Sequence, residues 1–280
     1  MTCDCDVRVG IGPDGHVPSL VLVFLTGVPC RPGSSLHNMH MHESADTNAA
    51  IWKSEEAVQR WVTEAEAQER RRAEQRRLMA VLLPFGEDDE FRFLDLGAGT
   101  GAASRAILER YPQATAILAD FSAQMMGAGE SQLQPFAGRY RYVEFDMTTG
   151  GWSPELPDAL DAIVTSMSVH HLTDERKQGL FAEILAHLVP GGWYFNFDPV
   201  TATDPAVRAT WERVADIEDP AAAHKRHNRT PEQAAHWENH VRYIIPLDQQ
   251  LEYLRAAGFQ GIDVYWKKLE NVIYGGYRPD

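Results

Sequence analysis

Residues 91–102 read FRFLDLGAGTGA, and this stretch decides the fold. An apolar run typical of a buried strand leads into a turn in which every second residue is glycine, at Gly97, Gly99 and Gly101. Glycine permits backbone dihedrals that other residues avoid, and it lets a ligand approach the main chain. A helix that follows such a turn presents unpaired N–H groups to a bound anion or polar group. The stretch therefore predicts a strand–turn–helix unit with a ligand site at the turn.

Outward from this unit, short apolar runs alternate with helix-length segments. The sequence predicts strands at Phe91–Leu96, Ala114–Ala119, Tyr140–Phe145, Leu160–Thr165, Trp193–Phe197, Ile262–Lys267 and Asn271–Tyr274. It predicts helices at Ala102–Tyr111, Ser122–Leu133, Asp174–Leu188 and Leu247–Ala257. Such alternation predicts a parallel sheet that is covered on both faces. The last two strands are joined only by Lys268–Glu270, which is too short for a crossover, so this pair should be antiparallel.

The predicted fold class is therefore α/β, a doubly wound, Rossmann-like sheet of seven strands with the last pair antiparallel and a helical cap. We expect a poorly ordered N-terminal arm at 1–45, and one domain at 46–280 whose cap elements lie at about 50–84 and 199–245. Translation could also start at Met39 or Met41, within this arm. Cys3, Cys5 and Cys30 all fall in the arm, so cysteine pairing cannot cross-link the body of the fold.

Charge and hydropathy exclude several classes of function. The 280 residues include 26 Lys and Arg against 40 Asp and Glu, a net charge of −14. Proteins that bind nucleic acids or anionic membranes carry a surplus of basic side chains, so neither is expected as a partner. No apolar run approaches the ~20 residues that span a bilayer. We expect a cytoplasmic enzyme with a small-molecule substrate; its oligomeric state is left open, with a homodimer as one alternative.

Two classes of ligand fit the glycine turn. Gly97, Gly99 and Ala102 satisfy the dinucleotide pattern, which would indicate a nicotinamide-dependent oxidoreductase. The alternative takes Asp95 as part of the pattern, two residues before Gly97. A pyrophosphate would be repelled by this acid, whereas a ligand with sulfonium and ammonium charges would be favoured by it. Asp120, nineteen residues after Gly101 at the end of the next strand, suits the hydroxyls of a ribose.

The glycine turn resembles motif I of the class I S-adenosylmethionine-dependent methyltransferases, and further segments between about Trp52 and Pro279 resemble that family's later motifs in order. ILADFS at 117–122 resembles the second-strand motif, VEFDM at 143–147 the third, and IVTSMSVHHL at 163–172 the fourth. LVPGG at 188–192 resembles the turn before strand five. The resemblance implies S-adenosylmethionine as cofactor, bound by Asp95, Gly97, Ala98, Gly99, Thr100, Gly101, Asp120, Phe121, Ser122, Met125, Asp146, Met147 and Ser166.

The reaction implied by the resemblance is methyl transfer to a small-molecule acceptor by in-line displacement. The protein would mainly position the reactants and exclude water. If the acceptor must lose a proton, His170 or His171 is the expected catalytic base, since the pKa of histidine lies near neutrality. A protein that binds S-adenosylmethionine without catalysis is the alternative outside the enzymes.

A histidine-rich segment follows the fifth strand, with His224, His227, His236 and His240. His236 and His240 would share one helix face and could hold a metal ion, with Glu238 or another His as a further ligand. The segment lacks a compact ligand motif, so no metal is expected there. It is better interpreted as part of the cap, with pocket-shaping side chains from Trp52, Trp61, Trp211, Arg229 and Trp237.

Overall fold

A computed structural model of the chain describes residues 72–280. The predicted N-terminal arm, the alternative start at Met39 or Met41 and the three cysteines lie outside the described residues. So do Trp52, Trp61 and most of the cap element expected at 50–84, whose final part is described as a helix over 72–82. No helix among the described residues is both long enough and apolar enough to cross a membrane.

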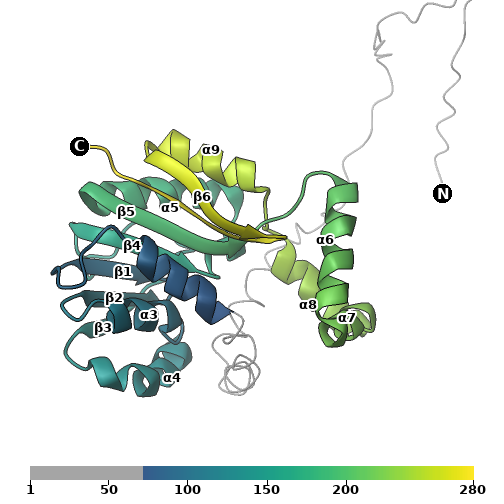
Figure 1. Cartoon of the computed structure of the whole chain (residues 1–280), viewed down its shortest axis with the longest axis horizontal. Coiled ribbons are helices and arrows are strands. Elements are labelled where there is room, and N and C mark those ends of the chain that lie inside the picture. Colours follow the sequence, from purple (N-terminus) through teal and green to yellow (C-terminus); the bar gives the residue numbers. More distant parts are fainter. Residues whose placement is uncertain (1–71) are drawn as a thin grey trace, which may run out of the picture. The chain divides into compact units, whose positions relative to one another are not determined.

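One sheet of seven strands organises these residues (Figure 1). Its order is β3-β2-β1-β4-β5-β7-β6. The neighbours among β1 to β5 are parallel, and β7 is antiparallel to both β5 and β6. The predicted seven-stranded sheet with an antiparallel final pair is confirmed. The strands are β1 Arg92–Leu96, β2 Thr115–Asp120, β3 Tyr140–Glu144, β4 Leu160–Ser166, β5 Leu188–Pro199, β6 Gln260–Lys268 and β7 Asn271–Tyr277.

The four predicted helices form within a residue of their expected bounds. They are α3 Ala102–Arg110, α4 Ala123–Leu133, α5 Asp174–His187 and α9 Leu247–Ala257. Strand β5 differs from the prediction, because it begins at Leu188 and runs through the expected turn at 190–192. The register between β4 and β5 shifts at this point, and Gly191 there has φ +76°. The backbone amide of Gly191 donates to the carbonyl of Arg278 at 2.9 Å. The expected turn is therefore an irregularity within a paired strand.

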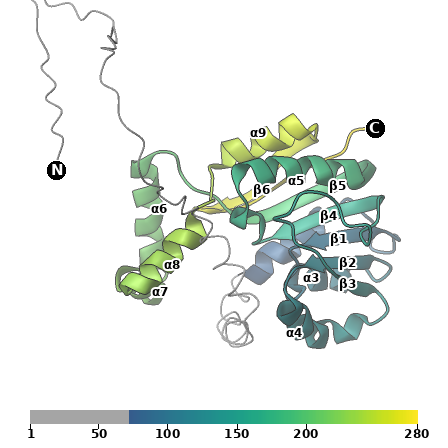
Figure 2. The same cartoon turned by 180° about the vertical axis from the view of Figure 1, so that it is seen from behind.

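Alternating side chains of β1 divide the core between the two faces of the sheet. Leu94 and Leu96 pack with residues of α5 and α9, including Phe181. Phe93 points to the opposite face, where it packs with α3 and the helix at 72–82. Figure 2 shows α5 and α9 on one side of the sheet and α3 and α4 on the other. Helices on both faces confirm the doubly wound prediction.

The core assignment can be tested at Leu94, which is fully buried in the central strand. We expect Leu94→Ala to lower the free energy of unfolding by about 2–5 kcal/mol, because it leaves a cavity in a close-packed layer. Urea denaturation followed by circular dichroism measures this change. Val81 is 55% exposed and is the matched control. Val81→Ala should change the free energy by less than about 0.5 kcal/mol, and an equal loss in both variants would contradict the assignment.

Three helices between β5 and α9 form the segment expected as a cap at 199–245. They are α6 Pro205–Glu218, α7 Pro220–His227 and α8 Pro231–Val241, and they stand together at one end of the sheet (Figures 1 and 2). Each begins with a proline directly after a side chain that accepts from backbone amides, at Asp204, Asp219 and Thr230. Both features favour helix starts, so the sequence defines these three helices locally.

Candidate functional site

The glycine turn lies at the carboxyl end of β1, as predicted. Its first residue, Gly97, has φ +73°, and the amides of Gly97 and Ala98 both donate to the carbonyl of Ala119 on β2, at 2.8 and 3.1 Å. A Cβ at Gly97 would lie 2.5 Å from Cε of Met147 and 2.6 Å from Cβ of Ser168. Glycine is therefore required here both by the backbone and by the space available.

Asp95 lies beneath this turn and is 1% exposed. Its Oδ2 accepts from the amide of Ser104 at 3.0 Å and from the Ser104 hydroxyl at 2.7 Å, which ties β1 to α3. Its Oδ1 has no hydrogen-bond partner among the described residues. Burial raises the pKa of Asp95 to about 6, against the hydrogen bonds from Ser104 that lower it. A buried carboxylate oxygen without a partner favours a ligand that brings a donor or a positive charge.

Asp120 connects the turn to the end of β2. Its Oδ2 accepts from the amide of Gly99 at 2.7 Å, and its Oδ1 accepts from the amide of Ser122 at 2.8 Å. Burial raises the pKa of this carboxyl, and the nearby charge of Asp146 raises it further. A carboxylate offers about four lone-pair sites, so Asp120 keeps acceptor capacity for ligand hydroxyls.

Other predicted cofactor residues surround the turn. Met125 on α4 and Met147 after β3 approach Gly99 and Gly97 from two sides. Thr100 and Gly101 are buried in the turn itself. Met147 also accepts through its carbonyl from Nε of Arg176 at 2.7 Å. The structure thus brings side chains from three strand ends to one place.

Three predicted cofactor residues are hydrogen-bonded to other groups of the protein. Ser122 caps α4, since its hydroxyl accepts from the amide of Met125 at 3.2 Å. Asp146 is exposed and accepts from the Thr148 hydroxyl at 2.7 Å. Ser166 accepts from Nε of Arg76 at 3.4 Å. Ala98 and Phe121 are half-buried. A cofactor role for these residues stays a prediction.

The predicted catalytic histidines follow β4, in the one-turn helix η2 Val169–His171. Strand β4 leads into η2 through Met167, which has φ +59° and whose amide donates to the carbonyl of Phe197 at 2.8 Å. His170 is 2% exposed, and its Nδ1 lies 2.7 Å from Oδ1 of Asp198 on β5, which is fully buried. No described residue gives the Nε2 of His170 a hydrogen-bond partner. The ring is thus fixed through Nδ1, while its Nε2 is buried.

A third histidine completes the group. His240, near the end of α8, has its ring centroid 5.2 Å from that of His170 and 5.1 Å from that of His171. Burial lowers the pKa of His170 to about 3 and that of His240 to about 4, and it also lowers the pKa of His171. Burial raises the pKa of Asp198 to about 7. All three imidazoles are therefore neutral at pH 7.

Comparison with known proteins decides the family. Residues 93–192 match a family model described as a methyltransferase domain. Trans-aconitate 2-methyltransferase of Azoarcus sp. strain BH72 is 30% identical over 215 residues, which cover 76% of this chain and 77% of that protein. The chain belongs to the class I S-adenosylmethionine-dependent methyltransferases. Its cofactor is therefore S-adenosylmethionine, and the nicotinamide alternative is set aside.

Further similarities cover less of the compared proteins. Malonyl-[acyl-carrier protein] O-methyltransferase of Chlorobium phaeovibrioides is 34% identical over 113 residues, 40% of this methyltransferase and 41% of that protein. The crystal structure of human N-acetylserotonin methyltransferase in complex with S-adenosylmethionine has a TM-score of 0.55 at 16% identity. The alignment covers 85% of this chain and 60% of the human one, and at this identity it shows the fold alone.

The residues at the turn fit S-adenosylmethionine. The unpartnered Oδ1 of Asp95 suits the cationic methionine part. Tyr142, which the sequence did not single out, supports the turn because its hydroxyl donates to the carbonyl of Gly99 at 3.2 Å. Nothing in its sequence context distinguishes it from other strand tyrosines.

The sequence analysis does not single out Asp198, and it does not place His240 beside His170 and His171. Asp198 follows the apolar run of β5, so an acid at the carboxyl end of a strand was a usable signal. His240 was instead grouped with His236 and Glu238, both of which are exposed on α8. The other two histidines of that segment bind locally: His227 to Asp216 at 2.7 Å, and His224 to Asn228 at 3.1 Å.

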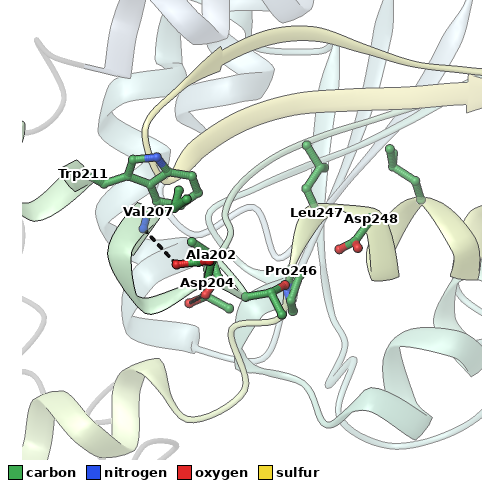
Figure 3. Close-up of a pocket in the computed structure, with 10 residues that line it drawn as sticks. Ala202, Asp204, Val207, Trp211, Pro246, Leu247 and Asp248 are labelled. Carbon is green, nitrogen blue, oxygen red and sulfur yellow. Dashed lines mark hydrogen bonds between the residues drawn. The ribbon is translucent and has the colours of Figure 1, made fainter. Parts of the chain in front are cut away.

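A hollow of the methyltransferase lies where β5 leads into α6, across from the start of α9 (Figure 3). Its volume is about 390 Å³. Trp211 forms one wall, with the Lys267 ammonium 4.1 Å from its ring centroid. None of its lining residues belongs to the glycine turn or to the histidine group. They are Thr201, Ala202, Thr203, Asp204, Val207, Trp211, Pro246, Leu247, Asp248 and Leu251.

Proposed function

We propose that this methyltransferase transfers a methyl group from S-adenosylmethionine to an oxygen atom of a small-molecule acceptor. The observation that supports this most directly is the position of the His170–Asp198 pair. It sits at the carboxyl ends of β4 and β5, on the same edge of the sheet as the glycine turn after β1. In open α/β sheets, this edge is where ligands bind.

The chain's own residues would bind the cofactor as follows. The turn at 97–101 and the Oδ1 of Asp95 would receive the methionine part, and Asp120 would accept from the ribose hydroxyls. Asp146 would accept from the adenine amine, with Met125 and Met147 as apolar contacts. When bound, S-adenosylmethionine supplies an activated methyl group that a nucleophile can displace in line. Most of the rate enhancement then comes from orientation and exclusion of water.

His170 would take the proton from an acceptor hydroxyl, with the negative charge of Asp198 opposing the burial that lowers the pKa of His170 to about 3. An ionised Asp198 accepts from Nδ1–H of His170, which leaves the lone pair on Nε2 to receive the proton. Asp198 then stabilises the positive charge on the ring. The lack of a partner for Nε2 among the described residues supports this role. His171 is the second candidate for the same step.

Three further observations support a small oxygen acceptor. The relatives reported above are named for trans-aconitate and for O-methylation of malonyl-[acyl-carrier protein], which are organic acids or their carriers. The cap helices α6 to α8 would cover the acceptor, with Arg229 stacked on Trp237 at 4.3 Å as part of the cover. An excess of 14 negative charges argues against a nucleic-acid acceptor.

Calorimetry and turnover test the proposal. We expect the full chain to bind S-adenosylmethionine but not NAD, and Asp120→Ala to raise the Kd for S-adenosylmethionine about 10–100-fold, because it removes hydrogen bonds to a charged acceptor worth about 1.5–3 kcal/mol. Asp158, whose side chain is 96% exposed, is the control, and Asp158→Ala should leave the Kd unchanged.

Turnover is measured with a panel of hydroxy acids and dicarboxylic acids, with methylated product detected by mass spectrometry. Product from an oxygen acceptor supports the proposal. Binding of S-adenosylmethionine without any transfer across the panel would favour the non-catalytic alternative, and transfer only to nitrogen or carbon acceptors would contradict the oxygen assignment.

A further inference from the structure

The three histidines beside the acceptor position form a group with the geometry of a metal site. His170 and His171 come from η2, and His240 comes from α8, about 70 residues later in the chain. Each offers one ring nitrogen, and these nitrogens all lie within 4.8 Å of one another. We propose that His170, His171 and His240 bind a divalent transition-metal ion of the zinc class.

The buried ring of His170 is the strongest support. Its Nδ1 is occupied by Asp198 at 2.7 Å, so Nε2 is the nitrogen left for a ligand, and Nε2 has no partner among the described residues. A histidine that ligates a metal through one nitrogen commonly donates through the other to a carboxylate, which fixes the tautomer and the ring orientation. His170 and Asp198 already have this arrangement.

The number and type of ligands indicate the class of ion. Three neutral imidazoles suit zinc, nickel or copper, whereas calcium and magnesium prefer oxygen ligands. Three histidines leave a fourth tetrahedral position open, as in catalytic zinc sites. With metal–nitrogen bonds of about 2.0–2.1 Å, the three nitrogens of a tetrahedral site lie roughly 3.3 Å apart. The present nitrogen separations, all within 4.8 Å, would have to shorten to that value when the ion binds.

Charged groups around the histidines indicate what the open position receives. Asp198 contributes negative charge, whereas Arg72 and Lys177 contribute positive charge that lowers the pKa of His170. Lys177 is itself paired with Asp174, at 3.4 Å. A divalent ion held by three neutral imidazoles would itself favour an anionic partner at the open position. An acceptor that presents an ionisable oxygen has the required chemistry.

The inference rests on the proposed function and changes one part of it. In the metal-loaded protein, Nε2 of His170 is a ligand, so it no longer takes the acceptor proton. The ion instead lowers the pKa of the acceptor hydroxyl, and the proton passes to solvent. Asp198 then acts as a positioning residue for the ligand His170.

Cobalt titration of the untagged full chain tests the site. The protein is first freed of metal with a chelator, which is then removed. Visible d–d bands of tetrahedral Co²⁺ are expected at one ion per chain and should disappear when one equivalent of Zn²⁺ is added. His240→Gln should weaken Co²⁺ binding at least tenfold, as should His171→Gln, because each removes one of three ligands; circular dichroism checks that each variant is folded.

His236, one helical turn before His240 and exposed, provides the matched control, and His236→Gln should bind Co²⁺ like the wild type. Absence of tetrahedral bands in the wild type would overturn the proposal. So would unchanged binding in His240→Gln, or sulfur-to-metal bands, which would place the ion at the cysteines of the N-terminal segment. Calorimetry with S-adenosylmethionine on the metal-free protein separates the two proposals, because cofactor binding and transfer without any metal binding would refute only the metal site.

Discussion

Gly97→Val is expected to weaken binding of S-adenosylmethionine by more than about 100-fold, which corresponds to roughly 2.7 kcal/mol. The substitution places a branched side chain where Met147 and Ser168 already pack against the glycine turn, so the turn must move. It also requires a β-branched residue to adopt φ near +73°. Together with the clash, this should lower the free energy of unfolding by about 2–5 kcal/mol. Calorimetry with S-adenosylmethionine and urea denaturation measure the two effects.

Two variants make this result interpretable. Gly97→Ala adds only the Cβ, so it should fold more stably than the valine variant and still bind the cofactor poorly. Gly127 lies on the exposed face of α4, and a Cβ added there would have no neighbouring atom within 4 Å. Gly127→Ala should keep full binding and gain about 0.5–1 kcal/mol of stability from helix propensity. Normal binding by a folded Gly97→Ala protein would contradict the assignment of the turn as the cofactor site.

The sheet could be predicted from the sequence because its signals are local. Apolar runs of strand length alternate with helical segments, and the link at 268–270 is too short for any connection but a hairpin. The insertion of β7 between β5 and β6 could not be predicted, because it depends on pairing between distant strands. The path of β5 through Gly191 also depends on pairing between distant segments. A proline and two glycines indicate a turn there, but hydrogen bonds with the C-terminal segment keep the strand extended.

The residues of the candidate site also differ in how well local sequence predicts them. Glycines and acids at the ends of β1 and β2 could be predicted, since motif and strand position coincide there. The grouping of His240 with His170 could not, because helical spacing relates His240 only to its own helix, as in the pairing with His236. Only the packing of α8 against η2 brings it to the strand ends. Local patterns therefore predict the glycine turn and the acids beside it better than they predict the group of His170, His171 and His240.

Asp198→Asn is expected to lower kcat about 100-fold or more while the Kd for S-adenosylmethionine stays within about twofold. The amide keeps the size of the carboxyl but removes the charge that holds Nδ1–H of His170 and leaves the lone pair on Nε2. Either proposed use of that lone pair, as a base or as a metal ligand, is weakened. Because burial raises the pKa of Asp198 to about 7, loss of its charge should cost little stability. Steady-state kinetics with the acceptor found in the panel measures kcat and KM separately.

Comparing the change in kcat with the change in the Kd for S-adenosylmethionine distinguishes a role of Asp198 in the reaction from a structural role. A structural defect at the end of β5 would lower stability and weaken cofactor binding together, since β4 connects this strand to β1. Asp263 on β6 is exposed, and its carboxylate accepts only locally, from the amide of Val264 at 2.7 Å. Asp263→Asn should therefore leave kcat unchanged. An Asp198→Asn enzyme with wild-type kcat would show that the ring of His170 needs no carboxylate, and the acceptor-side chemistry proposed for this pair would be wrong.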